Sequence, residues 1–290
     1  MSFEITGCHV AAEYTLTGDL KRFIDNRLPN VIHYAQLAGQ EILNIYNSEF
    51  QIENKQDNTP VTCADLAANE LLVRELSQLS SEFPVLSEES ELVDFEQRQQ
   101  WQTYWLVDPL DGTRTFIERT GEFSVNIALI HNHRPVLGVI HSPVKDCTFY
   151  ASYQKGAFSH RASQVKSIQV RSSCPATVTV AGTRSSQGHK IQKFLERLRG
   201  QFDDVDLKFM GSSLKSCMVA EGIADVYVRL GPTSEWDTAA AQCIVEAAGG
   251  RITDTRLRSL QYNTKESLLN PNFLVFGDQN IDWSVFLDDD

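Results

Sequence analysis

The sequence predicts an α/β (α+β) protein built in layers, with a mostly antiparallel sheet in its first half and alternating strands and helices in its second. Three observations predict it. Apolar residues recur at helical spacing before residue 80, short apolar runs follow between residues 104 and 152, and strand and helix patterns alternate beyond about residue 170. At about 150 residues per domain, we expect two units, residues 1–170 and 171–290.

The first elements are expected to be helices. Residues 1–30 carry little periodicity, and the first helix is expected over 31–47, where six apolar residues share one face: Val31, Tyr34, Ala35, Ala38, Ile42 and Ile45. A second helix is indicated over about 64–79, because Leu72, Leu76 and Leu79 repeat at helical spacing. The acidic segment 87–100 is expected to be a loop, with or without a short helix.

A meander of strands is expected next. The apolar run 104–107 ends at Asp108-Pro109, and the strand should stop there because proline cannot continue a central ladder. Residues 123–129 alternate with period two, and the runs 136–140 and 147–152 follow after polar stretches. This spacing predicts an antiparallel meander.

The second half is expected to alternate strands and helices. Strands are indicated at 178–180 and 226–228, and helices near 188–199, 213–221 and 237–248. Asp237 precedes an alanine-rich run that ends at Gly249-Gly250, which is typical of a helix with an N-cap and a glycine C-cap.

Composition excludes several classes of function. Asp and Glu number 38 against 26 Lys and Arg, and a net charge of −12 would repel a polymeric nucleic acid. No apolar run reaches the roughly 18–20 residues of a transmembrane segment, and no signal peptide is evident. We therefore expect a cytoplasmic protein, with peripheral attachment to the cytoplasmic face of the inner membrane left open. Six scattered cysteines form no C-x-x-C pair, so neither zinc nor a redox pair is expected.

The segment 108–113, Asp-Pro-Leu-Asp-Gly-Thr, is the most informative. Asp108 and Asp111 follow a strand and can project from one turn toward one point, with the Leu110 carbonyl between them. Such hard oxygen ligands suit Mg²⁺ or Mn²⁺ far better than zinc. The backbone N–H groups of Gly112 and Thr113 could hold an anion there. The alternative for this segment alone is a solvated turn.

Three further acidic segments accompany it: Leu86-Ser-Glu-Glu-Ser90, Thr59-Pro-Val-Thr-Cys-Ala-Asp65 and Glu235-Trp-Asp-Thr-Ala-Ala-Ala241. A carboxylate such as Asp237 at a helix N-terminus stays ionised, which is the state that a metal ligand needs.

In this order and spacing, the four segments resemble the lithium-sensitive inositol monophosphatase superfamily of Mg²⁺-dependent phosphomonoesterases, over roughly residues 31–277. Segments 105–117, 121–130, 211–215 and 229–237 are most similar to its CysQ-type 3′(2′),5′-bisphosphate nucleotidases. The resemblance implies the layered αβαβα sandwich of the inositol monophosphatase and fructose-1,6-bisphosphatase type. It also implies hydrolysis of the 3′-phosphate of adenosine 3′,5′-bisphosphate (PAP), a by-product of sulfate assimilation, and sensitivity to lithium.

The resemblance assigns roles to particular residues. Two or three Mg²⁺ ions, with Mn²⁺ as an alternative, would be held by carboxylates and one carbonyl: Glu88, Asp108, Asp111, Asp237 and Leu110. Asp65 and Thr113 would orient and deprotonate the attacking water. Bound metal ions are expected because the hydrolysis of a phosphate monoester in water is very slow and metal ions accelerate it.

Substrate recognition is expected to rest on the second half. Lys215 and Arg229 are candidates to receive the second phosphate of a nucleotide bisphosphate, and Ser212 could add a hydroxyl. The same cavity should involve Gly112, Thr113 and Asp237. The chain departs from the family at Ser186, where a histidine beside the adenosine is usual, and His189 could substitute for it. Arg114 and Thr115 also stand where lysine and glutamate are common.

Two alternatives stay open at this point. The runner-up enzyme is an inositol monophosphatase or another sugar phosphatase, and PAPS is a further candidate substrate. The alternative of a different class is a catalytically silent metal or nucleotide sensor on the same scaffold. Asp65 and Thr113 favour the enzyme, because activating water is of no use to a sensor. The sequence identifies no partner protein and no oligomeric state.

Overall fold

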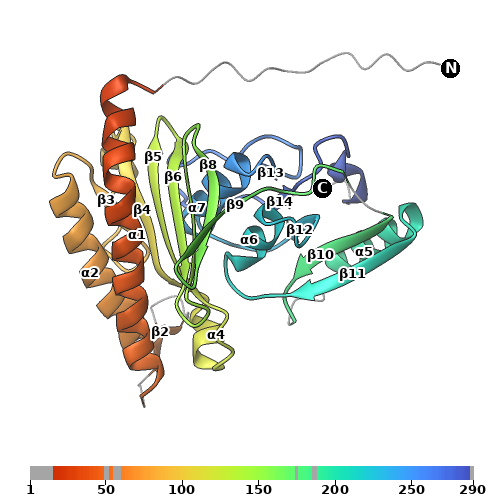
Figure 1. Cartoon of the computed structure of the whole chain (residues 1–290), viewed down its shortest axis with the longest axis horizontal. Helices are drawn as coiled ribbons and strands as arrows, with labels where there is room; N and C mark the ends of the chain where they lie inside the picture. The colour runs from red at the N-terminus through yellow and green to blue at the C-terminus, as the bar shows by residue number, and fades with distance from the viewer. Residues whose placement is uncertain (1–15, 49–51, 55–59, 174–175, 185–187, 288–290) are drawn as a thin grey trace.

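The structure, a computed structural model, describes residues 16–48, 52–54, 60–173, 176–184 and 188–287, which form five layers (Figure 1). One outer layer contains α1 (Gly18–Tyr46) and α2 (Cys63–Leu79), which pack on a seven-stranded sheet. The middle layer contains α6 (Leu214–Ala220) and α7 (Glu235–Ala247). A five-stranded sheet and α5 (His189–Gln201) complete the sandwich. The predicted αβαβα fold class is confirmed.

The seven-stranded sheet has the order β3-β4-β5-β6-β7-β8-β9, with β3 and β4 parallel and all later neighbours antiparallel. Its strands are β3 (Val85–Ser87), β4 (Thr103–Asp111), β5 (Ser124–His131), β6 (Arg134–Ser142), β7 (Cys147–Ser152), β8 (Gly156–Arg161) and β9 (Gln164–Ile168). The predicted meander is therefore confirmed as β5, β6 and β7. Strand β9 was missed because four of its five residues are exposed at the sheet edge, where no apolar pattern is required.

Strand β4 runs past Pro109 to Asp111, so the prediction that it ends at Asp108-Pro109 was wrong. The pairing of β4 with β5 shifts register between Asp108 and Asp111. Pro109 lies within this irregularity, where its missing N–H breaks no ladder hydrogen bond. The short helix α4 (Thr113–Ile117) follows directly.

Helix α1 begins at Gly18, so the predicted start of the first helix at residue 31 was wrong. Thr17 caps the helix by accepting a hydrogen bond from the Leu20 N–H at 3.3 Å. Leu20 and Ile24 are buried, but the charged residues around them mask the helical period in the sequence. Helix α2 lies where it was predicted, and the acidic loop contains a short helix, α3 (Phe95–Arg98).

The five-stranded sheet has the order β11-β10-β12-β14-β13 and is mixed. Its strands are β10 (Thr177–Gly182), β11 (Asp204–Phe209), β12 (Val226–Arg229), β13 (Arg251–Asp254) and β14 (Phe273–Phe276). The predicted strands at 178–180 and 226–228 are confirmed within β10 and β12, which are parallel. The chain also forms a small pair, β1 (Ile52–Asn54) with β2 (Pro60–Thr62), and a 3₁₀ turn, η1 (Trp283–Phe286).

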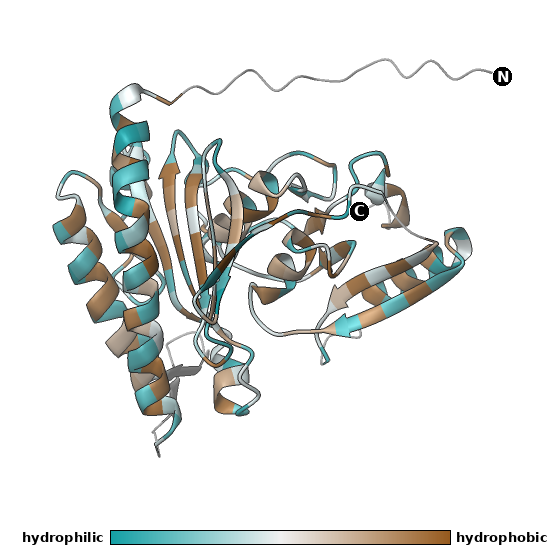
Figure 2. Cartoon of the chain, viewed as in Figure 1, coloured by the Kyte–Doolittle hydropathy of each residue, from teal (hydrophilic) through white to brown (hydrophobic). Residues whose placement is uncertain are grey.

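Helix α7 lies against the first sheet at very close range. A Cβ atom on Gly138 of β6 would come within 2.5 Å of the Ala240 carbonyl oxygen, so only glycine fits there. The largest apolar cluster accordingly mixes residues from before and after residue 170. The strands of the large sheet are mostly apolar, whereas α1 and α2 alternate between polar and apolar residues along their length (Figure 2). The boundary near residue 170 stays a prediction.

Candidate active site and metal centre

Three carboxylates meet where the two halves of the chain join. Asp108 and Asp111 come from the irregular end of β4, and Asp237 comes from the first turn of α7. One carboxylate oxygen of each lies within 4.8 Å of the others. The structure therefore brings together three of the four side chains predicted to bind metal.

Hydrogen bonds fix these carboxylates and leave oxygens unused. Asp237 Oδ2 accepts a hydrogen bond from the Ser234 N–H at 2.6 Å, which completes a capping box at the start of α7. Asp108 Oδ1 accepts one from the Leu110 N–H at 3.1 Å. Asp108 Oδ2 is buried and has no hydrogen-bond partner among the described residues. A buried carboxylate oxygen without a partner is costly, so this atom fits a bound cation.

Burial and mutual repulsion dominate the electrostatics of this cluster. Burial raises the pKa of Asp108 well above its usual value, and the charges of Glu88 and Asp111 raise it further. Burial, followed by the charge of Asp111, raises the pKa of Asp237 to about 8. Without a cation the cluster would hold protons near neutral pH, and a divalent cation can replace them. The donor set of carboxylates suits Mg²⁺ or Mn²⁺.

Glu88 lies beside this cluster but is not one of the three carboxylates that meet. It follows β3, and its N–H donates to the Val107 carbonyl oxygen on β4 at 3.2 Å. Its charge contributes to the raised pKa of Asp108, so the two side chains lie within electrostatic range. The Leu110 carbonyl oxygen accepts a hydrogen bond from Thr113 Oγ1 at 3.4 Å.

Asp65 and Thr113 form the expected pair next to the cluster. Thr113 Oγ1 lies 3.1 Å from Asp65 Oδ1, while Asp65 Oδ2 accepts from the Thr62 N–H at 2.8 Å and from its hydroxyl at 2.6 Å. Burial raises the pKa of Asp65, and the hydrogen bonds from Thr62 oppose that rise. Gly112 precedes Thr113 with φ +95°, a conformation that favours glycine and turns the chain from β4 into α4.

A cavity of about 480 Å³ opens from this point into the second half of the chain. It is lined by five of the six residues predicted to bind substrate: Gly112, Ser212, Lys215, Arg229 and Asp237. Thr113 is not among its lining residues. Lys215 is 5% exposed, and its ammonium donates to the Ser212 carbonyl oxygen at 2.6 Å and lies 5.3 Å from the Tyr227 ring centroid. Burial lowers the pKa of Lys215 to about 8.

Arg229 stands at the mouth of this cavity. Its Nη2 donates to the Pro232 carbonyl oxygen at 3.1 Å, whereas its Nε is buried and has no partner among the described residues. An unpaired buried donor of a guanidinium is suited to an anionic oxygen.

A second cavity of about 450 Å³ adjoins the first and was not expected from the sequence. It lies between α5 and the edges of β10, β11 and β12, and its apolar lining includes Val180, Leu195 and Leu207. Thr183, Tyr227 and Arg229 line both cavities, which are therefore neighbours. Ser186 lies outside the described residues, and His189 lines neither cavity.

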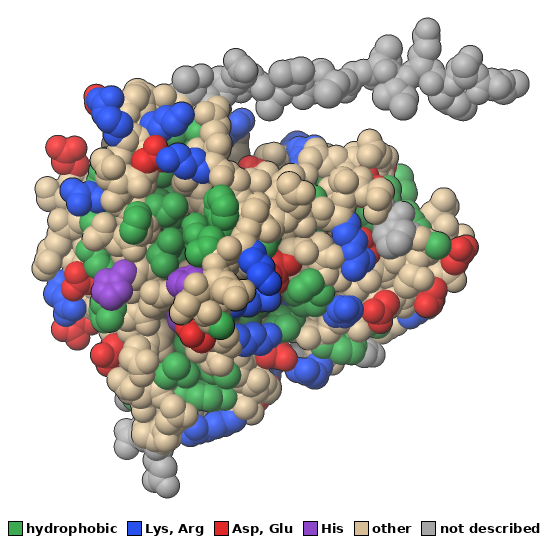
Figure 3. Space-filling view, in the orientation of Figure 1, with side chains coloured by type: hydrophobic (Ala, Val, Ile, Leu, Met, Phe, Trp, Pro, Cys, Tyr) green, Lys and Arg blue, Asp and Glu red, His purple; other side chains and the backbone are tan. Residues whose placement is uncertain are grey.

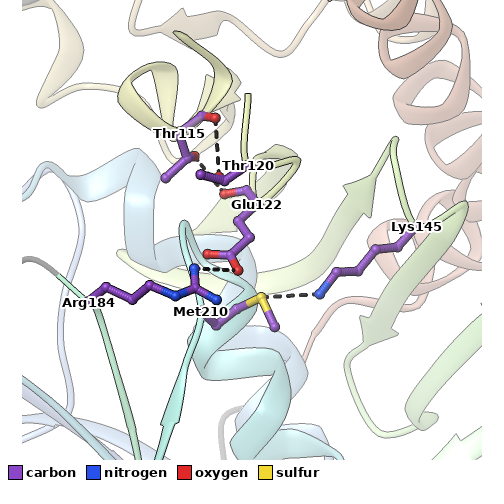
Figure 4. A network of polar contacts seen from close by, with 6 residues as sticks. All are labelled: Thr115, Thr120, Glu122, Lys145, Arg184 and Met210. Carbon is purple, nitrogen blue, oxygen red and sulfur yellow. Dashed lines mark hydrogen bonds and ion pairs between the residues drawn. The ribbon is translucent and has the colours of Figure 1, made fainter. Parts of the chain in front are cut away.

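Polar contacts join the two halves near Thr115, which lines the first cavity (Figure 4). Arg184, just after β10, forms an ion pair with Glu122 at 3.0 Å, and Lys145 donates to the Met210 sulfur at 3.2 Å. Thr115 Oγ1 lies 2.7 Å from the Gly112 carbonyl oxygen and 2.8 Å from that of Glu122. Thr115 therefore takes a part in holding the loop around Gly112.

Sequence reasoning missed Asn126 and Ser213, which both contact Asp111. Asn126 lies within β5, all eight residues of which are buried, so its amide faces the protein interior. A polar residue inside a strand that is otherwise apolar was the available signal. This signal was overlooked because apolar and polar residues also alternate in a strand that has one face in water.

Comparison with known proteins gives a consistent result. The sequence model of the inositol monophosphatase family matches residues 27–279. A 3′(2′),5′-bisphosphate nucleotidase CysQ of Haemophilus influenzae is 41% identical over 269 residues, which cover 90% of this chain and 97% of that protein. The protein of the same name from Salmonella typhimurium is 45% identical over 250 residues, covering 86% and 98%.

Solved structures agree with the sequence comparisons. The crystal structure of CysQ from Bacteroides thetaiotaomicron, described as a bacterial member of the same family, superposes with a TM-score of 0.77 at 37% identity. The superposition covers 89% of this chain and 98% of that one. The similarity therefore extends over most of both chains.

Proposed function

The chain belongs to the inositol monophosphatase family, and on that premise we propose that it is a 3′(2′),5′-bisphosphate nucleotidase. It would hydrolyse the 3′-phosphate of PAP to give AMP and inorganic phosphate, with PAPS as a further substrate, in sulfur assimilation. The observation that carries the proposal is the placement of three carboxylates, the buried Asp108 and the half-buried Asp111 and Asp237, beside the Asp65–Thr113 pair and at the end of a cavity lined by Lys215 and Arg229.

Metal ions would be held by the carboxylates of Glu88, Asp108, Asp111 and Asp237 and by the Leu110 carbonyl. We propose two or three Mg²⁺ ions, with Mn²⁺ as an alternative. When bound, they supply a nucleophilic water at neutral pH and neutralise charge on the scissile phosphate. The unpartnered Asp108 Oδ2 and the raised pKa of Asp237 support this assignment.

Water activation would fall to Thr113 and Asp65. Thr113 donates its proton toward Asp65 Oδ1, which leaves the lone pairs of Thr113 Oγ1 free to accept from a water molecule. As the water oxygen attacks phosphorus, its proton can pass to Thr113 and the threonine proton to Asp65. The bond from phosphorus to the 3′-oxygen of the nucleotide breaks, and that oxygen takes a proton from solvent water to become the 3′-hydroxyl of AMP. No covalent enzyme intermediate is needed.

The second phosphate would bind Lys215 and Arg229, with Ser212 close by. Both cations line the cavity that begins at the carboxylate cluster. The adjoining apolar cavity, which shares Thr183, Tyr227 and Arg229 with the first, would receive the adenine. An inositol or sugar monophosphate would use neither the cations nor the apolar cavity, so these features favour the nucleotide over the runner-up substrates.

A sensor without activity is the alternative of a different class. It would need the metal ligands and the phosphate-binding cations but not a base for water. The hydrogen bond between Thr113 and Asp65 beside the metal site favours the enzyme.

A phosphate-release assay across PAP, PAPS, inositol 1-phosphate and fructose 1,6-bisphosphate tests this proposal. We expect the highest kcat/KM for PAP and no turnover in EDTA. Full activity without a divalent metal would contradict the metal assignment, and a preference for inositol 1-phosphate would establish the sugar-phosphatase alternative.

A small nucleotide is the proposed partner, and polymeric nucleic acid is not. Acidic and basic side chains are interspersed on the face shown in Figure 3, without the basic stripe that a nucleic-acid backbone requires. Among the helices of the described ranges, none has both the length and the apolar composition needed to cross a bilayer. The cytoplasm is the proposed location.

A further inference from the structure

Ser213 connects the carboxylate cluster to the substrate cavity. Its N–H and its hydroxyl both approach Asp111 Oδ2, at 2.6 and 2.5 Å. The same hydroxyl oxygen lies 2.8 Å from the Asp237 carbonyl oxygen in the first turn of α7. Ser213 is 5% exposed and comes from the segment before α6, whereas Asp111 ends β4, so this contact spans the two halves of the chain.

Asn126 completes the support from the side of the sheet. Its Nδ2 donates to Asp111 Oδ2 at 3.2 Å and lies 3.0 Å from Ser213 Oγ, while its Oδ1 accepts from the Ser124 hydroxyl at 3.0 Å. Because an ionised carboxylate only accepts hydrogen bonds, the Nδ2 group of the amide must face Asp111, which leaves Oδ1 to accept from Ser124. Both residues lie on β5 and are buried.

Three donors therefore converge on one oxygen of Asp111. An oxygen that accepts three hydrogen bonds has little capacity left for a cation, so Oδ1 is the oxygen through which Asp111 can bind metal. The direction of that oxygen depends on Ser213 and Asn126, because a carboxylate rotates freely about its terminal torsion unless its other oxygen is held.

We propose that Ser213, supported by Asn126, is a positioning residue that fixes the metal-binding oxygen of Asp111. This inference rests on the proposed metal site and names a determinant of its affinity. Ser213 lies between Ser212 and Lys215 in the sequence, and both of these line the substrate cavity.

The test is a titration of the purified protein with Mg²⁺ alone by isothermal calorimetry, and with Mn²⁺ by electron paramagnetic resonance. Ser213→Ala keeps the backbone donor and loses the hydroxyl, and we expect its metal affinity to fall about 10-fold, within the roughly 10- to 100-fold range of such supporting contacts. Ser213→Thr keeps the hydroxyl and should restore the affinity. Ser152→Ala is the matched control, because Ser152 is also buried and its hydroxyl has no partner among the described residues.

Kinetics separate positioning from a general structural role. For Ser213→Ala, raising Mg²⁺ should restore kcat, while KM for PAP at saturating Mg²⁺ should stay unchanged. Asn126→Ala removes a donor to the same oxygen from the other half of the chain and tests the proposal if Ser213→Ala does not fold. An unchanged metal affinity in a folded Ser213→Ala or Asn126→Ala protein would overturn the proposal. The titrations use no substrate, so they stand whichever phosphate ester the enzyme prefers.

Discussion

The two halves of the molecule hold their functional residues in different ways. In the first half, Asp108 and Asp111 end a strand of the seven-stranded sheet, whose neighbour β5 is buried at every residue. In the second half, Lys215 and Arg229 lie on a seven-residue helix and a four-residue strand, next to two cavities. Asp108 and Asp111 are thus carried by a closely packed sheet, whereas Lys215 and Arg229 lie on short elements that border cavities.

This difference indicates that catalysis and substrate specificity depend on different residues of the structure. Positions in a packed sheet tolerate little displacement, which suits ligands that must meet at one point. Residues around a cavity can change without disturbing that frame. Changes at Asp108 and Asp111 should therefore affect every substrate, and changes at Lys215 and Arg229 should affect substrates selectively.

The largest effect is expected from the metal ligands. Asp108→Asn and Asp111→Asn should each lower kcat by at least about 1,000-fold for PAP and inositol 1-phosphate alike, since several kcal/mol of charge stabilisation depend on the metal. The proteins should remain folded by circular dichroism, because each substitution removes a buried like charge. If a variant kept measurable turnover with a normal Mg²⁺ requirement, the assignment of that residue as a metal ligand would be wrong.

Replacing the pair that activates water should have the next largest effect. Thr113→Ala and Asp65→Asn should lower kcat by about 100- to 10,000-fold with little change in KM, because they act on water and not on the bound phosphate. Steady-state kinetics on two substrates would measure this. A higher KM with a normal kcat would show that the pair binds substrate instead.

A smaller and selective effect is expected in the second half. Arg229→Ala or Lys215→Ala should lower kcat/KM for PAP by about 10- to 150-fold, the equivalent of one charge-assisted hydrogen bond of about 1.5 to 3 kcal/mol. Inositol 1-phosphate has no second phosphate and should be nearly unaffected by Arg229→Ala. Equal losses on both substrates would end the distinction between the halves and would favour the sugar-phosphatase function.

The smallest effect is a dependence on pH. Burial lowers the pKa of Lys215 to about 8, so its ammonium is charged below pH 8 and loses its proton above it. The kcat/KM for PAP should therefore fall, relative to that for inositol 1-phosphate, as pH rises from 7 to 9, by up to about tenfold per pH unit above 8. A ratio that stays constant across this range would show that Lys215 does not act through its charge on the second phosphate.

The parts of the fold and site that could be predicted were those with a strong local signal. The segment 108–113 pointed to Asp108 and Asp111 because two carboxylates and a carbonyl follow a strand there, and Asp237 was proposed through the family resemblance of its segment. The start of helix α1 before residue 31 was missed although Leu20, Ile24 and the partly buried Leu28 continue its apolar face. Pro29 lies within the helix, where proline is more typical of a helix boundary. Ser213 and Asn126 act through a contact between residues 87 positions apart. No local pattern encodes such a contact.

The close contact of α7 with the large sheet has a consequence for synthesis on the ribosome. Strands β4 to β8 are complete at Arg161, but the helix that covers their inner face begins at Glu235. At about 5–20 residues per second, the intervening 74 or so residues take about 4 to 15 s to add. During that time the apolar face of the seven-stranded sheet that later packs against α7 at Gly138 is not covered by any other part of the chain. The nascent protein should therefore depend on chaperones most strongly in this interval.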